Sequence, residues 1–66
     1  MWHVLRFDQF PGQGITVGVF TSQTDAEAEA KPLAGEFEHH GFEGEQGYWW
    51  GRNDGEQPVR FLVQAE

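Results

Sequence analysis

The chain has 66 residues, no cysteine and 15% aromatic residues, and its 11 acidic side chains outnumber its 4 basic ones to give a net charge of −7. A chain of this length forms one domain, residues 1–66; the lack of cysteine excludes disulfides and thiolate metal sites, and the aromatic content argues against disorder. No apolar run reaches the roughly 20 residues of a membrane span and no signal-peptide core is present, so we expect a soluble cytoplasmic protein.

Two strands are predicted at the start of the chain. Residues 2–7 (WHVLRF) and 15–20 (ITVGVF) alternate their side chains in the way of half-buried strands. Residues 8–14 between them are rich in turn formers, and Pro11 followed by Gly12 fits the centre of a type II turn. We therefore expect these strands to form a hairpin.

A helix is predicted to follow the hairpin. Thr24 begins a capping box with Glu27, whereas Ser22 before it suits a capping or turn role. Small or apolar residues then recur at helical spacing, ending at a glycine stop: Ala26, Ala30, Leu33, Phe37 and Gly41. Pro32 conflicts with this pattern, because proline in a helix interior removes a hydrogen bond and costs about 3 kcal/mol. We expect a helix that is kinked at Pro32, or split so that a second helix begins there.

Two further strands are predicted at residues 47–53 (GYWWGRN) and 59–64 (VRFLVQ). Asn53-Asp54-Gly55 between them is a strong hairpin signal. The predicted fold is therefore α+β: a four-stranded antiparallel sheet, β-β-α-β-β along the chain, with one helix packed on one face.

Seven carboxylates and one cation, Lys31, lie between residues 25 and 45. At about 100° per residue, the acids of the predicted helix form two ridges beside its apolar stripe, and the later ones gain nothing from the helix dipole. The negative electrostatic field of these acids attracts basic protein surfaces and repels nucleic acid and anionic membranes. We predict that these residues bind a partner: Asp25, Glu29, Glu36, Glu38, Glu43, Glu45 and Asp54. The alternative is that the acids serve only solubility.

The acidic run DAEAEAKPLAGEFEHHGFEGE, the small size and the lack of cysteine resemble, as a class, the anti-CRISPR proteins of phages that act as DNA mimics. The resemblance implies a target in the basic nucleic-acid groove of a CRISPR effector complex. It also implies a location in the host cell cytoplasm if a phage encodes the chain. No site residues transfer, since such inhibitors share no sequence pattern.

The segment VGVFTSQTDAEAEAKPLAGEFEHHGFE is similar to the strand and helix of SPOR domains, in which a Gly-x-Phe strand precedes a helix ending in Gly-Phe. That resemblance implies binding to peptidoglycan glycans in the periplasm. The chain lacks the second strand motif of these domains and has Pro32 in the helix.

Three neighbouring aromatic residues, Tyr48, Trp49 and Trp50, cannot all face one way from a strand. If Tyr48 and Trp50 join the core, Trp49 faces the other side, where it either covers the sheet or anchors a partner or a second copy. Gly18 and Gly51 leave space for a ring to lie across the backbone.

Catalytic and metal sites are not predicted. His39 and His40 point about 100° apart on a helix, so they cannot easily share an ion. Ser22 is not accompanied by a histidine and a carboxylate in the pattern that activates a catalytic serine. Gly12, Gly14 and Gly18 do not make a phosphate loop. We predict a non-enzymatic protein without cofactors, a monomer or homodimer that occupies a basic nucleic-acid-binding surface of a protein partner. The alternative is a module for protein interaction or self-association through an aromatic patch.

Overall fold

The computed structural model describes residues 1–9 and 12–66. Its elements in chain order are β1 (Trp2–Phe7), β2 (Ile15–Phe20), α1 (Gln23–Gly35), β3 (His39–Glu43), β4 (Tyr48–Arg52) and β5 (Val59–Ala65). The structure confirms the predicted bounds of the first two strands, and it confirms those of the last two to within one residue. The predicted turn at Pro11 lies outside the described residues.

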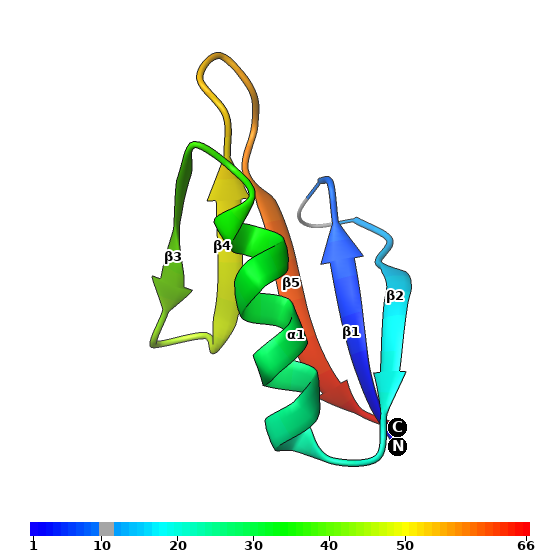
Figure 1. Cartoon of the computed structure of the whole chain (residues 1–66). Helices are drawn as coiled ribbons and strands as arrows, with labels where there is room; N and C mark the ends of the chain where they lie inside the picture. Colours follow the sequence, from blue (N-terminus) through cyan, green and yellow to red (C-terminus); the bar gives the residue numbers. More distant parts are fainter. Residues whose placement is uncertain (10–11) are drawn as a thin grey trace.

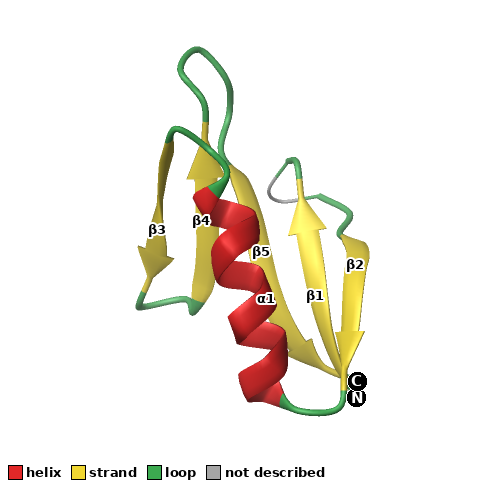
Figure 2. Cartoon of the chain, in the orientation of Figure 1, coloured by secondary structure: helices red, strands yellow, loops and turns green. Residues whose placement is uncertain are grey.

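The described strands form an antiparallel sheet in the order β2-β1-β5-β4-β3, and α1 crosses one face of this sheet (Figures 1 and 2). The last strand in the chain, β5, lies at the centre. It joins the β1–β2 hairpin on one side to the β3–β4 hairpin on the other. The predicted hairpins, β1–β2 and β4–β5, are both confirmed.

The predicted count of four strands is wrong, because the sheet has a fifth strand, β3, where the prediction has the end of the helix and the loop after it. The helix ends at Gly35, a residue with weak helix propensity, and β3 then pairs with β4 across a tight turn. In that turn Gly47 has a φ of 74° and donates its N–H to the Glu43 carbonyl over 2.8 Å. Glycine adopts this left-handed backbone at no steric cost. Pairing with β4 therefore overrides the helical spacing of Phe37 and Gly41.

The N-cap of the helix lies two residues before the predicted cap, Thr24. Ser22 is the N-cap, and its hydroxyl accepts the N–H of Asp25 over 3.1 Å. Pro32 lies inside one continuous helix, so the predicted split does not occur. The proline frees the Ala28 carbonyl, and both residues are exposed, so water can satisfy that oxygen. With 13 residues, α1 is neither long nor apolar enough to cross a membrane.

The core lies between α1 and the covered face of the sheet. Three alanines of the helix, Ala26, Ala30 and Ala34, are at most 1% exposed, and they pack with Val4 and Phe61 of the sheet. Their small side chains let the helix approach the strands closely. Larger, partly buried side chains surround this centre: Trp2, Phe20, Leu33, Phe37, Trp49 and Val63.

Replacing Ser22 by alanine tests the observed start of the helix. We expect Ser22→Ala to lower the free energy of unfolding by about 1 kcal/mol, because the Asp25 N–H loses its acceptor. Urea unfolding followed by circular dichroism measures the change. Thr24→Ala is the matched control and should have little effect. If Thr24→Ala lowered the free energy of unfolding more than Ser22→Ala, the N-cap would be Thr24, as the sequence predicts.

Candidate functional site

The acids of α1 lie on its outer side, away from the three buried alanines. Asp25 and Glu29 are exposed, and Glu27 is partly exposed. Asp25 lies in the first turn, where a negative charge complements the helix dipole. Lys31 is the cation of this helix, and it is exposed. The outer side of the helix is therefore strongly negative.

None of the seven acids between residues 25 and 45 forms an ion pair with a lysine or arginine among the residues that the structure describes. The recorded ion pairs involve other acids: Arg6 with Asp8, and two histidines with Asp54 and Glu66. The predicted lack of compensation by basic side chains is thus confirmed for this part of the chain.

Three of the predicted residues, Glu36, Glu38 and Asp54, lie near the C-terminal end of α1, and we call them the acidic end. Glu36 is the C-cap of α1, Glu38 lies between α1 and β3, and Asp54 lies in the turn between β4 and β5. All three are exposed. The prediction that Glu36 and Glu38 belong to a helical ridge is wrong, because the helix ends at Gly35.

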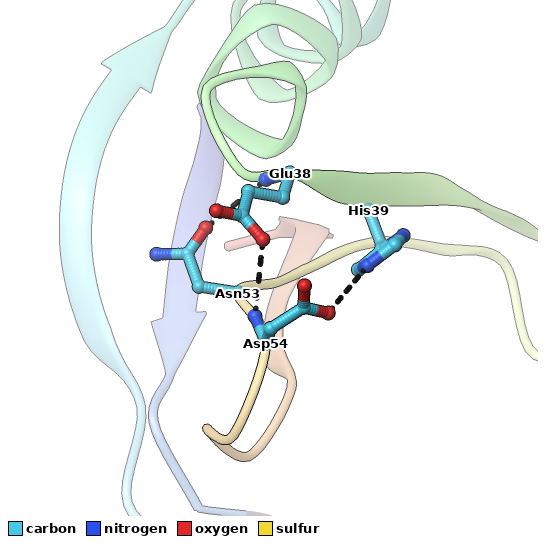
Figure 3. Close-up of polar contacts among 4 residues, drawn as sticks. All are labelled: Glu38, His39, Asn53 and Asp54. Atoms are coloured by element: carbon cyan, nitrogen blue, oxygen red, sulfur yellow. Dashed lines mark hydrogen bonds and ion pairs between the residues drawn. The ribbon is translucent and has the colours of Figure 1, made fainter.

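Hydrogen bonds join two members of the acidic end, Glu38 and Asp54, to each other and to their neighbours (Figure 3). The Glu38 N–H donates to the Asn53 side-chain oxygen over 3.0 Å, and the Asp54 N–H donates to Glu38 Oε2 over 3.3 Å. His39 Nε2 lies 2.7 Å from Asp54 Oδ1. The hydrogen bond from His39, and then its charge, lower the pKa of Asp54. Asp54 therefore keeps its negative charge further into acid than an ordinary aspartate does.

Glu38, His39 and Asp54 each offer a ligand atom within 4.8 Å of the others, and all three residues are exposed. The hydrogen bonds just described account for this arrangement without an ion. The position of the histidines differs from the prediction, because His39 and His40 lie in β3 and not at the end of a helix. Neighbouring strand residues face opposite sides of the sheet, so they cannot bind one ion together.

The remaining predicted acids, Glu43 and Glu45, lie at the other end of β3 from the acidic end (Figure 1). The five residues of β3 rise about 3.4 Å each, so roughly 14 Å separate the two groups along the strand. The Glu45 N–H donates to Glu43 Oε1 over 3.0 Å, which ties these two residues to each other. The structure thus divides the predicted acidic surface into two parts.

Trp49 faces α1, and the predicted orientation of the three neighbouring aromatics is wrong. Trp49 packs against the core and contacts Phe42 with ring centroids 4.7 Å apart. Its indole N–H is buried and has no hydrogen-bond partner among the described residues. The ring lines a hollow of about 290 Å³ with Lys31, Pro32 and His40. The strand alternates as predicted, but the opposite set of side chains faces the helix.

Tyr48 and Trp50 lie on the face of the sheet away from α1, which we call the helix-free face. Leu5 pairs with Leu62, and Leu62 pairs with Tyr48, so these side chains form a row across three strands of that face. The Arg60 guanidinium lies 4.8 Å from the centre of the Tyr48 ring. The helix-free face thus combines apolar, aromatic and cationic side chains.

Glycines leave space for aromatic rings, as predicted for Gly18 and Gly51. A Cβ added at Gly18 would lie 2.8 Å from the Phe20 ring, and one at Gly51 would overlap the Phe37 ring, whose Cγ is 2.7 Å away. Gly41, which was not predicted in this role, makes the same allowance for Trp50 at 3.1 Å.

The sequence matches no protein-family model, and it matches no curated protein and no solved structure at a significant level. The strand and helix of the SPOR-like segment correspond to β2 and α1, but Gly41-Phe42 lies in β3 and not at the end of the helix.

Proposed function

We propose that the chain is a non-enzymatic binding protein that occupies a basic surface of a protein partner through the outer side of α1 and the acidic end. The supporting observation is that the acids of residues 25–45 are unpaired with lysine or arginine among the described residues. Acids left without basic partners repel each other and weaken a small fold, so a use for their field explains why they are tolerated.

The partner that fits this chemistry is a protein whose basic groove binds nucleic acid. Carboxylates at positions i and i+4, such as Asp25 and Glu29, rise about 6 Å along the helix and present a row of negative charge. A groove that holds phosphates through lysine and arginine would accept such a row in place of them. The anti-CRISPR resemblance makes this proposal specific: the chain would block target DNA binding by a CRISPR effector complex, without binding nucleic acid itself.

A capture experiment tests the proposal. The immobilised chain should retain partner proteins from a cell lysate at low salt and lose them at high salt, because ionic strength screens long-range attraction. Duplex DNA added as a competitor should displace the same proteins, since both ligands use one groove. The Glu29→Lys/Glu36→Lys double variant should weaken capture by about tenfold or more.

The choice of substitutions follows from the hydrogen bonds of the acidic end. Glu38 accepts the Asp54 N–H, so Glu38→Lys would also disturb the turn, whereas Glu38→Gln keeps an oxygen acceptor there. Glu45→Lys makes the same change of charge as Glu36→Lys alone, at the far end of β3, and is the matched control for that single variant. Capture that resists both salt and DNA, or that Glu29→Lys/Glu36→Lys leaves unchanged, would contradict the proposal.

A second candidate function is protein interaction through the helix-free face. It is favoured by the row of Leu5, Leu62 and Tyr48, which α1 does not cover. Aromatic residues and arginine are common at the energetic centres of protein interfaces. Binding of this kind would change little with salt, and Trp50→Ala would weaken it where the acid substitutions would not.

A further inference from the structure

The two edges of the sheet differ in a way that the acidic surface does not explain. The outer edge of β2 pairs with no strand among the described residues, and the same is true of the outer edge of β3. The exposed edge strand β3 (HHGFE) carries two histidines and one glutamate. The other edge strand, β2 (ITVGVF), carries no charged residue and no proline.

The apolar side chains of β2 are largely exposed. Ile15, Val17 and Val19 are 60%, 46% and 47% exposed. An edge strand offers unpaired backbone N–H and C=O groups, and proteins usually guard such an edge with charge, proline or a bulge. Of these features β2 has only the bulge, seen as a one-residue shift in its pairing with β1 opposite Val4 and Leu5. The strand is otherwise open to another strand.

Electrostatic repulsion limits how two copies of this acidic chain can approach each other, and it is weakest at the β2 edge. Two copies that each carry a net charge of −7 repel most strongly where the acids of α1 face each other. The edge of β2 has no formal charge, and Arg6 and Asp8 near the end of the neighbouring strand β1 neutralise each other at 2.9 Å. The repulsion between two copies is therefore low when they meet at β2.

We propose that β2 pairs with β2 of a second copy, antiparallel about a twofold axis, so that the two sheets become one continuous sheet. The pairing is isologous, so the free backbone groups of each β2 edge are hydrogen-bonded to the other copy and neither edge stays open. The remaining outer edges are the two β3 strands, where His39, His40 and Glu43 oppose further addition. The assembly therefore stops at a dimer and does not grow into a fibre.

The geometry keeps the acidic helices apart. In this dimer both copies of α1 lie on the same side of the joined sheet, because antiparallel pairing about a twofold axis preserves the faces. Five strand spacings of about 4.8 Å separate the two β5 strands beneath the helices, roughly 24 Å in all. This exceeds a Debye length of about 8 Å at physiological salt, so the repulsion between the helices is screened. The dimer uses neither the outer side of α1 nor the acidic end, so it forms whether or not these surfaces bind a partner.

Sedimentation equilibrium over a series of concentrations tests the dimer. We expect a reversible dimer that strengthens with salt, because salt screens the remaining repulsion. Val19→Lys should raise the dissociation constant by about tenfold or more, although it reduces the net negative charge. Phe42→Lys is the matched control on the other edge, since Phe42 is 47% exposed as Val19 is, and it should leave the dimer intact.

Disulfide cross-linking of single-cysteine variants tests the dimer even if Val19→Lys folds poorly. The chain has no cysteine, so single substitutions Thr16→Cys, Val17→Cys and Val19→Cys each provide one reporter thiol. The position nearest the twofold axis should form a disulfide-linked dimer under mild oxidation, whereas Phe42→Cys should not. A chain that stays monomeric at all concentrations and salt levels would overturn the proposal. A dimer that Val19→Lys leaves unchanged, or one that Trp50→Ala dissociates instead, would also overturn it.

Discussion

Gly51→Ala is expected to prevent the chain from folding stably. Gly51 is buried in β4, under the point where the chain leaves α1. An added Cβ would lie 2.7 Å from Phe37 Cγ and 2.8 Å from the Ala34 carbonyl oxygen. The ring is held in the core and the carbonyl belongs to the helix backbone, so neither can withdraw without moving α1 from the sheet. We expect a loss of about 3 kcal/mol or more, measured by urea unfolding.

That loss is as large as the whole stability that a domain of this size usually has, which is a few kcal/mol. Gly35→Ala is the matched control, because a Cβ there has no neighbour within 4 Å. It should be neutral or slightly stabilising, since alanine is the better helix former. If Gly51→Ala proved as stable as Gly35→Ala, α1 would have to lie further from β4 than the structure places it.

Phe61→Ala is expected to have the other large effect. Phe61 is 2% exposed at the centre of β5, and its ring centroid lies 6.3 Å from that of Phe37. The ring also faces the Arg6 guanidinium at 5.9 Å. Its removal leaves a cavity between helix and sheet, and such truncations cost about 3–5 kcal/mol. Loss of cooperative thermal unfolding in circular dichroism would show the effect.

Phe42→Ala is the control for the loss of an aromatic side chain, because Phe42 is 47% exposed at the edge of the sheet. Phe42→Ala should lower the free energy of unfolding much less than Phe61→Ala does. Phe61→Leu should retain a folded core, since leucine keeps most of the buried volume. Equal losses at positions 42 and 61 would mean that the core does not centre on β5.

The first two strands could be predicted because their side chains alternate between clear turn formers. The third strand, β3, could not, since its residues His39 to Glu43 include glycine and no β-branched residue. Its strand conformation comes from pairing with β4, which the local sequence does not encode. Gly44 and Gly47 in the turn between β3 and β4 are the signal for this hairpin, whereas the prediction makes Gly47 the first residue of the strand 47–53.

Alternation along β4 could be predicted from the sequence, but the choice of face could not. The choice depends on which side chain fits beneath the helix: Gly51 lies against Phe37 there, and Trp49 two residues earlier must face the same way. The close approach of glycine and alanines, and not the position of the largest aromatics, determines where α1 lies.

The excess of acids could be predicted from composition, and their lack of basic partners is confirmed among the described residues. Their grouping could not be predicted, because it depends on strand order. Asp54 meets Glu38 only because β4 lies beside β3 and brings its turn to the end of the helix. The helical projection instead placed Glu36 and Glu38 on two ridges at either side of the apolar stripe, with Glu43 in the loop that follows.

The central place of β5 has a consequence for synthesis on the ribosome. The β1–β2 hairpin and the β3–β4 hairpin have no strand in common until β5 emerges, since β5 alone pairs with both β1 and β4. Without β5 the two hairpins are linked only through α1, which contacts strands of both. Until β5 is in place, the two halves of the sheet are not joined to each other, and the uncharged outer edge of β2 is open to strands of other chains.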